Sequence, residues 1–150
     1  MCGITGFLDT RQGDSSAELE AKVTRMSDAI VHRGPDDSGT WVDAAAGVAL
    51  GFRRLAIVDL TPTGHQPIVS SSGRFVMVFN GEIYNYAELR NELIARGISF
   101  RGTSDSEVMV ESIDAWGLTS SVKRFNGQFA FALWDRRDRI LHLVRDRVGV

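Results

Sequence analysis

The sequence has a single cysteine, no long hydrophobic run and no excess of charge of either sign. One cysteine in 150 residues cannot form an intramolecular disulfide, so we expect a reducing, cytoplasmic environment. The longest apolar stretches, residues 75–79 and 129–134, have the length of strands and are too short to span a membrane. The amino terminus also lacks the basic flank and apolar centre of a secretory signal.

The charge balance and the spacing of the histidines exclude further classes of function. Seventeen Lys and Arg against nineteen Asp and Glu give a net charge of −2, too small to hold a nucleic acid or an anionic membrane. His32, His65 and His142 follow no metal-ligand spacing, and no G-x-x-x-x-G-K-S/T phosphate loop occurs. We therefore predict no nucleic acid, membrane, metal or cofactor partner for these residues.

Two local patterns predict helices with defined starts. Ser15 and Glu18 fit a capping box, and apolar residues at 19, 23, 26 and 30 form one face of a helix. Asn85 and Glu88 fit a second capping box, which predicts a helix over residues 86–96. A third helix is expected between a cap at residue 104 or 105 and a stop at residue 117.

The remaining segments predict strands and loops. We expect a loop over residues 32–39 and a turn-rich stretch over 61–73. Strands are expected at residues 4–8, 40–42, 48–52, 57–60 and 74–79, followed by a hairpin of 128–135 and 140–145. The order of elements lacks the regular alternation of a doubly wound parallel sheet, which favours an α+β layered domain.

Cys2 carries the most chemical information. The initiator methionine is normally removed before a small residue, and removal would give Cys2 a thiol and an α-amine. The reference pKa of that amine, about 7.7–8.0, makes it a plausible base for a thiol of pKa about 8.5. The alternative interpretation is an incidental, buried cysteine at the start of a strand.

Several ordered segments favour the chemical interpretation. They are CGI at 2–4, HRGPDDSG at 32–39, RLAIVD at 54–59, GHQP at 64–67, NGEIYN at 80–85, TSDSE at 103–107 and NGQFAFA at 126–132. From Cys2 to Val150, the chain resembles the glutaminase domain of glutamine-hydrolysing asparagine synthetases. The resemblance implies a class II glutamine amidotransferase domain with the N-terminal-nucleophile hydrolase fold, a four-layer αββα sandwich of two antiparallel sheets between helix layers.

The resemblance also implies a mechanism and its catalytic residues. Cys2 attacks the side-chain carbonyl of L-glutamine, ammonia leaves, and water hydrolyses the thioester to glutamate, with the α-amine acting as base and then as acid. Asn80 and Gly81 match the family's oxyanion hole, and an amide side chain and a glycine N–H are suitable neutral donors. The same Asn-Gly pair is a strong turn signal, and we expect a tight turn there.

Further residues match the family's glutamine-binding positions. Arg54 and Asp105 match the pair that holds the α-carboxylate and the α-ammonium group of glutamine. Alone, Arg54 would more often be a solvated charge and Asp105 a helix cap, so their roles depend on the resemblance. Backbone groups of Ile57, Val58 and Glu82 are expected nearby on the same basis.

The family also implies a partner domain in the same polypeptide. There, a C-terminal synthetase domain uses ATP and magnesium to amidate aspartate, so we expect residues 1–150 to be a glutaminase domain shortened at its C-terminal end. Two alternatives stay open: the same chemistry feeding another carboxylate in polysaccharide or secondary metabolism, and a non-catalytic regulatory or assembly module. A homodimer also stays open. The joint presence of the family's residues argues against the non-catalytic module; these are Cys2, Arg54, Asn80, Gly81 and Asp105.

Overall fold

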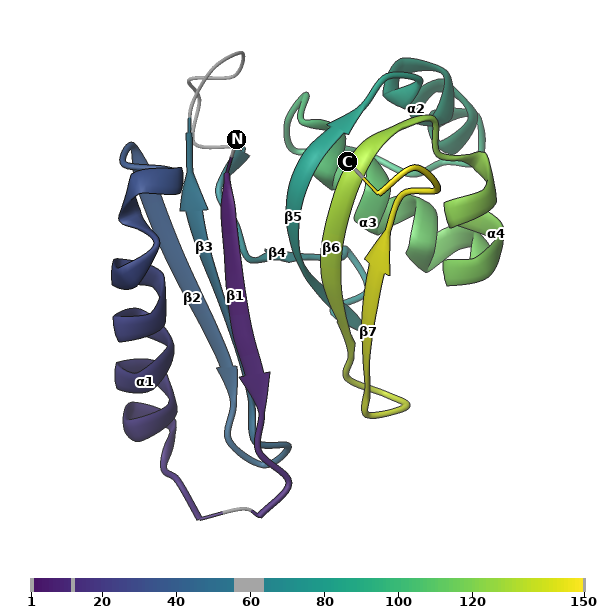
Figure 1. The fold of residues 1–150 in the computed structure, drawn as a ribbon. Coiled ribbons are helices and arrows are strands. Elements are labelled where there is room, and N and C mark those ends of the chain that lie inside the picture. The colour runs from purple at the N-terminus through teal and green to yellow at the C-terminus, as the bar shows by residue number, and fades with distance from the viewer. Residues whose placement is uncertain (1, 12, 56–63, 150) are drawn as a thin grey trace.

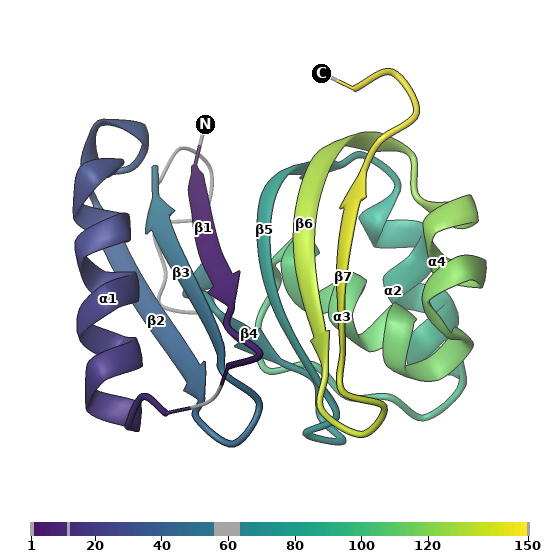
Figure 2. The ribbon, with the colours of Figure 1, turned by 60° about the horizontal axis from the view of Figure 1, so that its bottom comes forward.

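The computed structural model describes residues 2–11, 13–55 and 64–149. These residues form four layers in which two sheets face each other and helices cover both outer faces (Figure 1). The same order of layers is visible in the rotated view of Figure 2. The predicted α+β sandwich with two antiparallel sheets is therefore confirmed.

The first sheet has three strands and the second has four. The first has the order β1-β3-β2 and contains β1 (Gly3–Leu8), β2 (Asp37–Asp43) and β3 (Val48–Arg54). The second has the order β4-β5-β6-β7 and contains β4 (Ile68–Val69), β5 (Phe75–Ile83), β6 (Gly127–Asp135) and β7 (Ile140–Arg145). All pairings are antiparallel, so neighbouring strands can be joined by short turns, as β6 and β7 are in the predicted hairpin.

The helices divide unequally between the two outer faces. Helix α1 (Ser16–Ala29), followed by the 3₁₀ turn η1 (Val31–Arg33), packs on the first sheet. The second sheet carries α2 (Tyr86–Ala95), α3 (Asp105–Trp116) and α4 (Leu118–Arg124) (Figure 1). Within the described part of the chain, no helix combines the length and hydrophobicity that a membrane span requires.

The core has an apolar layer between each pair of neighbouring layers. Between the sheets, Phe52 and Leu50 of the first meet Val76, Val78 and Trp134 of the second, and all five are buried. A larger cluster lies between the second sheet and its helices, and a smaller one lies under α1. Since burying such a side chain contributes about 1.5–3 kcal/mol, the inter-sheet layer holds the two sheets firmly together.

Helix α1 begins as its sequence predicts. Ser15 Oγ accepts the N–H of Glu18 at 3.3 Å, and a Glu18 carboxylate oxygen accepts the N–H of Ser15 at 2.7 Å. These two bonds form the complete capping box and satisfy N–H groups that the helix itself cannot pair. Leu19 and Val23 are buried against the first sheet, so the predicted apolar face is confirmed.

The predicted cap of α2 is wrong, whereas the predicted cap and end of α3 are confirmed. Asn85 makes no capping bond to α2, although this helix covers the predicted range apart from its last residue. Instead, the Asn85 side chain donates to the carbonyl of Arg124 and accepts the N–H of Asn126, each at 3.0 Å. At α3, Ser104 is the cap and Gly117 ends the helix, which leaves the Asp105 carboxylate available for another partner.

Three elements depart from the predicted strand and loop ranges. Strand β2 starts inside the predicted loop, at Asp37, because residues 37–43 pair fully with β3. The short strand β4 lies inside the turn-rich stretch, and α4 was not predicted because Gly117 ends α3 and immediately starts α4. The strand expected at residues 57–60 lies outside the described residues.

The turn expected at Asn80-Gly81 is wrong. Both residues lie within β5, where they pair with Ala130 and Phe129 of β6. Gly81 has a φ of +147°, and a Cβ atom at this position would overlap the carbonyl oxygen of Gln128. Glycine is therefore required by the close approach of β6 and not by a turn.

Candidate active site

The Cys2 thiol lies where β1 begins and β3 ends. Its Sγ atom is 3.5 Å from the N–H nitrogen and 3.8 Å from the carbonyl oxygen of Leu55, within hydrogen-bond range for sulfur. The half-buried side chain packs against the apolar layer between the sheets, and Arg33 Nη2 donates to the Cys2 carbonyl at 3.4 Å. The thiol is thus held by backbone groups at one end of the sandwich.

Arg54 is the last residue of β3 and precedes Leu55. It is only 9% exposed, which is unusual for an arginine. Its backbone is fixed by register, because Arg54 pairs with Asp37 of β2 and its carbonyl accepts the N–H of Asp36 at 3.0 Å. Gly64 lies against the guanidinium group, since a Cβ atom there would be 2.5 Å from Nη2.

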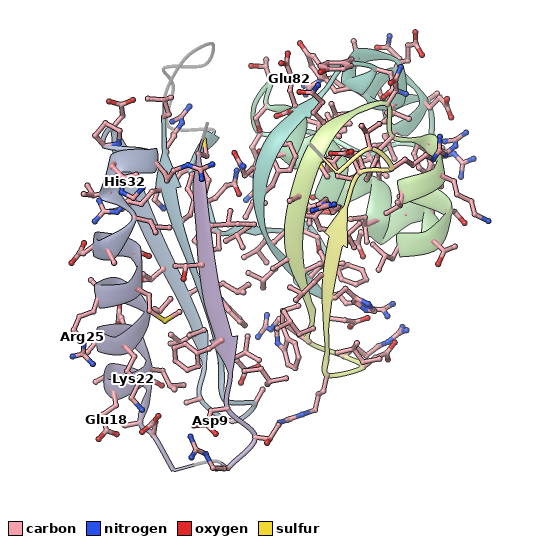
Figure 3. The ribbon with its side chains drawn as sticks, in the orientation of Figure 1. Asp9, Glu18, Lys22, Arg25, His32 and Glu82 are labelled. Atoms are coloured by element: carbon pink, nitrogen blue, oxygen red, sulfur yellow. The ribbon has the colours of Figure 1, made fainter. Side chains whose placement is uncertain are left out.

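The Asn80 and Glu82 side chains face the first sheet from β5. Side chains alternate along a strand, and Val76 and Val78 belong to the inter-sheet layer, so residues 80 and 82 share their face. Figures 1 and 2 both place the end of β5 at the same end of the sandwich as the start of β1. Figure 3 labels Glu82 at this end and Asp9 at the opposite one.

Among the described residues, no strand pairs with β5 at Gly81 on the side of β4. Phe75 and Phe79 direct their backbone groups toward the β4 side, since the carbonyl of Phe75 accepts the N–H of Ser70 and the N–H of Phe79 bonds to Gln66. Alternation gives Gly81 the same direction, two residues beyond Phe79 and past the end of β4. An amide side chain and a backbone N–H thus occur together near this end of the second sheet.

Asp105 is tied to the same segment of β5. Its Oδ2 atom accepts the N–H of Ile83 at 3.0 Å. Burial raises the pKa of Asp105 above that of an ordinary aspartate, and the Glu82 carboxylate adds to the increase, while N–H donors such as Ile83 oppose it. A half-buried carboxylate of this kind would be stabilised by a cationic ligand group.

The structure places the predicted site residues that it describes in two groups at the same end of the sandwich. Arg54 ends β3 of the first sheet and Cys2 immediately precedes β1, whereas Asn80, Gly81 and Glu82 lie on β5 and Asp105 begins α3. Ile57 and Val58 lie outside the described residues. In the described ranges, no three His, Cys, Asp or Glu side chains gather as a metal site would need.

Sequence reasoning missed the role of Gln66. It is 4% exposed, and its Oε1 atom accepts the N–H of Phe79 at 2.6 Å, next to Asn80. The GHQP segment carried part of the family resemblance, but a lone glutamine carries no pattern that would indicate this contact. Its position beside a proline and a short strand becomes informative only in three dimensions.

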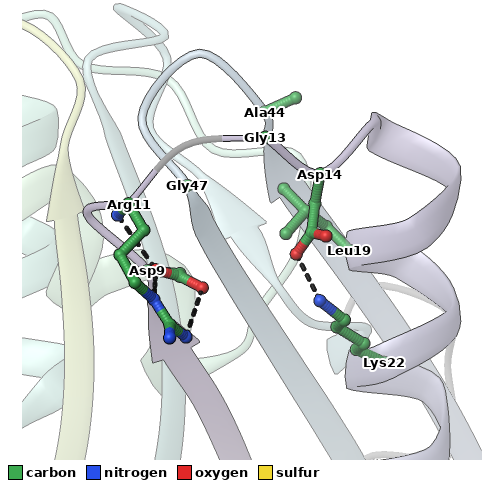
Figure 4. Close-up of a pocket in the computed structure, with 8 residues that line it drawn as sticks. All are labelled: Asp9, Arg11, Gly13, Asp14, Leu19, Lys22, Ala44 and Gly47. Carbon is green, nitrogen blue, oxygen red and sulfur yellow. Dashed lines mark hydrogen bonds and ion pairs between the residues drawn. The ribbon is translucent and has the colours of Figure 1, made fainter.

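A cavity of about 260 Å³ lies at the other end of the first sheet (Figure 4). An Asp9–Arg11 ion pair and an Asp14–Lys22 ion pair line it, and the Arg11 side chain is 90% exposed. None of its lining residues is a predicted site residue. The cavity and the candidate active site are therefore separate.

Comparison with known proteins places the whole chain in one family. The family described as "Glutamine amidotransferase domain" matches residues 1–150. The chain belongs to this glutamine amidotransferase family. The domain family and the resemblance drawn from the sequence segments agree.

Relatives of this glutamine amidotransferase domain are longer proteins. Asparagine synthetase [glutamine-hydrolyzing] 3 of Bacillus subtilis is 41% identical over 152 residues, covering 100% of this chain and 24% of the relative. Asparagine synthetase [glutamine-hydrolyzing] 1 of the same species is 38% identical, and amidase chry2 of Gibberella zeae is 37% identical, each with 23% of the relative covered. The chain thus spans about a quarter of the length of these relatives.

A solved structure agrees with the fold. Glutamine phosphoribosylpyrophosphate amidotransferase from Bacillus subtilis superposes with a TM-score of 0.51 at 24% identity. The match covers 60% of this chain and 21% of that one. It supports the amidotransferase sandwich as the architecture of these residues.

Proposed function

We propose that this domain hydrolyses the side-chain amide of L-glutamine to glutamate and ammonia, with Cys2 as nucleophile. The proposal is supported by a backbone-held thiol at the start of β1, at the same end of the sandwich as the end of β5 on the facing sheet, which carries Asn80 and Gly81. Acyl transfer needs a nucleophile on one side of a carbonyl and donors where its oxygen becomes negative.

In the proposed reaction, removal of Met1 frees the α-amine of Cys2. The amine takes the thiol proton as Sγ bonds to the amide carbon, and it returns the proton to the leaving nitrogen as ammonia departs. Water then adds to the thioester, loses its proton to the same amine, and displaces the thiol to give glutamate. The Asn80 side chain and the Gly81 N–H stabilise the oxyanion formed in both steps.

Two charged side chains orient the substrate in this proposal. Arg54 would hold the α-carboxylate through two parallel N–H donors, and its buried position limits the number of orientations it can adopt. Asp105 would hold the α-ammonium group, whose positive charge favours the ionised carboxylate. Glu82 and the backbone of Ile57 and Val58 are proposed to lie near the substrate.

We further propose that the ammonia serves an ATP- and magnesium-dependent synthetase domain later in the same polypeptide, in the cytoplasm. Relatives named asparagine synthetase support aspartate as the acceptor. The relative named amidase chry2 favours a second candidate, amidation of another carboxylate. ATP-dependent amidation of a panel of carboxylic acids by the full-length protein distinguishes the two.

The glutaminase proposal is tested by measuring glutamate release from glutamine by the full-length protein and by Cys2→Ala. We expect the substitution to reduce release by at least about a thousandfold, because it removes the nucleophile. A non-cleavable amino-terminal extension should have a comparable effect by acylating the amine. Equal release from the wild type and Cys2→Ala, or release from neither, would favour the non-catalytic module.

A further inference from the structure

Residues 64–67 join the two sheets immediately ahead of β4, and we call them the inter-sheet strap. The chain passes from the first sheet to the second along this region (Figure 1). The strap contains one buried polar side chain, that of Gln66, which is 4% exposed. Its Oε1 atom accepts the N–H of Phe79 at 2.6 Å, which also fixes the orientation of the amide, because only the oxygen can accept.

On the first sheet, the strap is held at β2 and at the end of β3. The backbone carbonyl of Gln66 lies so close to Gly39 that a Cβ atom there would overlap its oxygen. His65 Nδ1 is 2.8 Å from a carboxylate oxygen of Asp37. Together with the contact of Gly64 on Arg54, these interactions fix one end of the Gln66 side chain relative to the first sheet.

On the second sheet, the strap supplies a bond that β4 cannot. Strand β4 pairs with β5 only at Met77 and Val76, so the N–H of Phe79 lies beyond its backbone. Phe79 is 3% exposed, and an unpaired N–H at such a site would lower stability. Gln66 takes this N–H, immediately before Asn80 and two residues before Gly81.

We infer that Gln66 is a positioning residue that sets the oxyanion donors of the second sheet relative to the thiol of the first. The inference rests on the proposed function. Gln66 spans the two sheets through its own backbone and side chain, so its length determines where β5 lies at Phe79. The proposed donors, at residues 80 and 81, come directly after Phe79 in the chain. Oxyanion stabilisation depends on where such donors point.

The test uses Gln66→Met in the full-length protein, since methionine has a similar length but lacks a comparable acceptor. We expect kcat for glutamate release to fall about ten- to a hundredfold, less than the loss of a whole donor, with KM for glutamine changed less than about threefold. Affinity for the aldehyde analogue of glutamine should fall in parallel with kcat, because its thiol adduct places an oxyanion in the same hole. Gln66→Glu keeps an acceptor and should retain kcat within about fivefold.

Ser70→Ala is the matched control. Ser70 is 3% exposed, and its Oγ accepts the N–H of Phe75 on the same edge of β5, at the far end of the strand. A purely structural role for Gln66 predicts that both variants lose thermal stability and keep kcat and aldehyde affinity. Our inference predicts that only Gln66→Met lowers kcat and the affinity for the aldehyde.

The outcomes separate this inference from the proposed function. If Gln66→Met keeps wild-type kcat and aldehyde affinity while Cys2→Ala is inactive, the inference is wrong and the proposed function stands. If the wild type releases no glutamate, the proposed function fails first. If Gln66→Met fails to fold, Gln66→Asn replaces it, because asparagine shortens the same amide by one methylene. We expect the same loss of kcat and of aldehyde affinity. Unchanged values of both would overturn the inference.

Discussion

Arg54 and Gln66 are buried near the end of the sandwich where β1 begins, whereas the charged side chains that line the cavity at the opposite end form more exposed ion pairs. Arg54 and Gln66 are 9% and 4% exposed, while the side chains of Arg11 and Lys22 are 90% and 44% exposed. The cavity of Figure 4 belongs to the exposed end. This cavity is therefore a weaker indication of chemistry than polar atoms that are held in place.

The contrast has an energetic basis. An exposed ion pair contributes about 0–1 kcal/mol and leaves long side chains free to move, so it defines no atomic position well. A buried acceptor bonded to a backbone N–H cannot leave its partner without leaving that group unpaired. Reaction geometry is better held by the second kind of contact.

If only the end of the sandwich where β1 begins carries the chemistry, Asn80→Ala should have the largest effect on kcat after Cys2→Ala. Loss of one oxyanion donor is expected to lower kcat by about 10²–10³-fold, since the donor acts mainly on the transition state. Steady-state glutamate release measures this. Asn85→Ala, which removes an asparagine with structural bonds only, should keep kcat, and a similar loss in both variants would contradict the assignment.

Asp105→Asn should act on binding more than on the chemical step. Asparagine keeps an acceptor for the N–H of Ile83 but lacks the charge for an ammonium group. A charged hydrogen bond contributes about 1.5–3 kcal/mol, so KM for glutamine should rise about ten- to 150-fold. Asp114→Asn, on the same helix, should leave KM unchanged, and equal behaviour of the two variants would remove Asp105 from the site.

The pH dependence of glutamine affinity should report the raised pKa of Asp105. Glutamine's ammonium binds the ionised carboxylate, so kcat/KM should fall as the pH drops through the pKa of the free enzyme. Because that pKa is raised, the fall should begin above the range of an ordinary aspartate, about 3.9. Asp105→Asn should lack this acidic limb, and its persistence in the variant would assign the limb to another group.

The smallest effect is expected at the opposite end of the sandwich. Lys22→Met keeps the aliphatic stem and removes the charge that pairs with Asp14. The unfolding free energy should change by less than about 1 kcal/mol, and kcat/KM should not change. Denaturant unfolding and glutamate release measure the two quantities, and a large kinetic loss would make the cavity part of the reaction site.

Local sequence patterns predicted the elements that depend on contacts between residues close together in the sequence. The Ser15–Glu18 cap and the apolar stripe of α1 need only neighbours within two turns, and both are found. The hairpin of β6 and β7 follows from two apolar runs joined by polar residues. The turn predicted at Asn80-Gly81 was wrong because the pair that favours a turn also fits a strand to which β6 approaches closely.

The arrangement of the candidate site was beyond local patterns. Arg54 and Asp105 were identified through family resemblance, since an isolated arginine or aspartate has no spacing that marks a ligand. Their common location depends on the packing of two sheets, which brings together segments that are far apart in sequence. Gln66 was missed because its contact with the N–H of Phe79 joins two segments that no pattern of residues links.

The apolar layer between the sheets also packs against Cys2 on the first sheet and includes the residues that precede Asn80 on the second. Val76 and Val78 fill this layer directly below Asn80 on the same face of β5. Their volume therefore contributes to the distance that a substrate carbonyl must bridge. Evolutionary selection for turnover would then constrain the size of these two valines, although neither carries a reactive group.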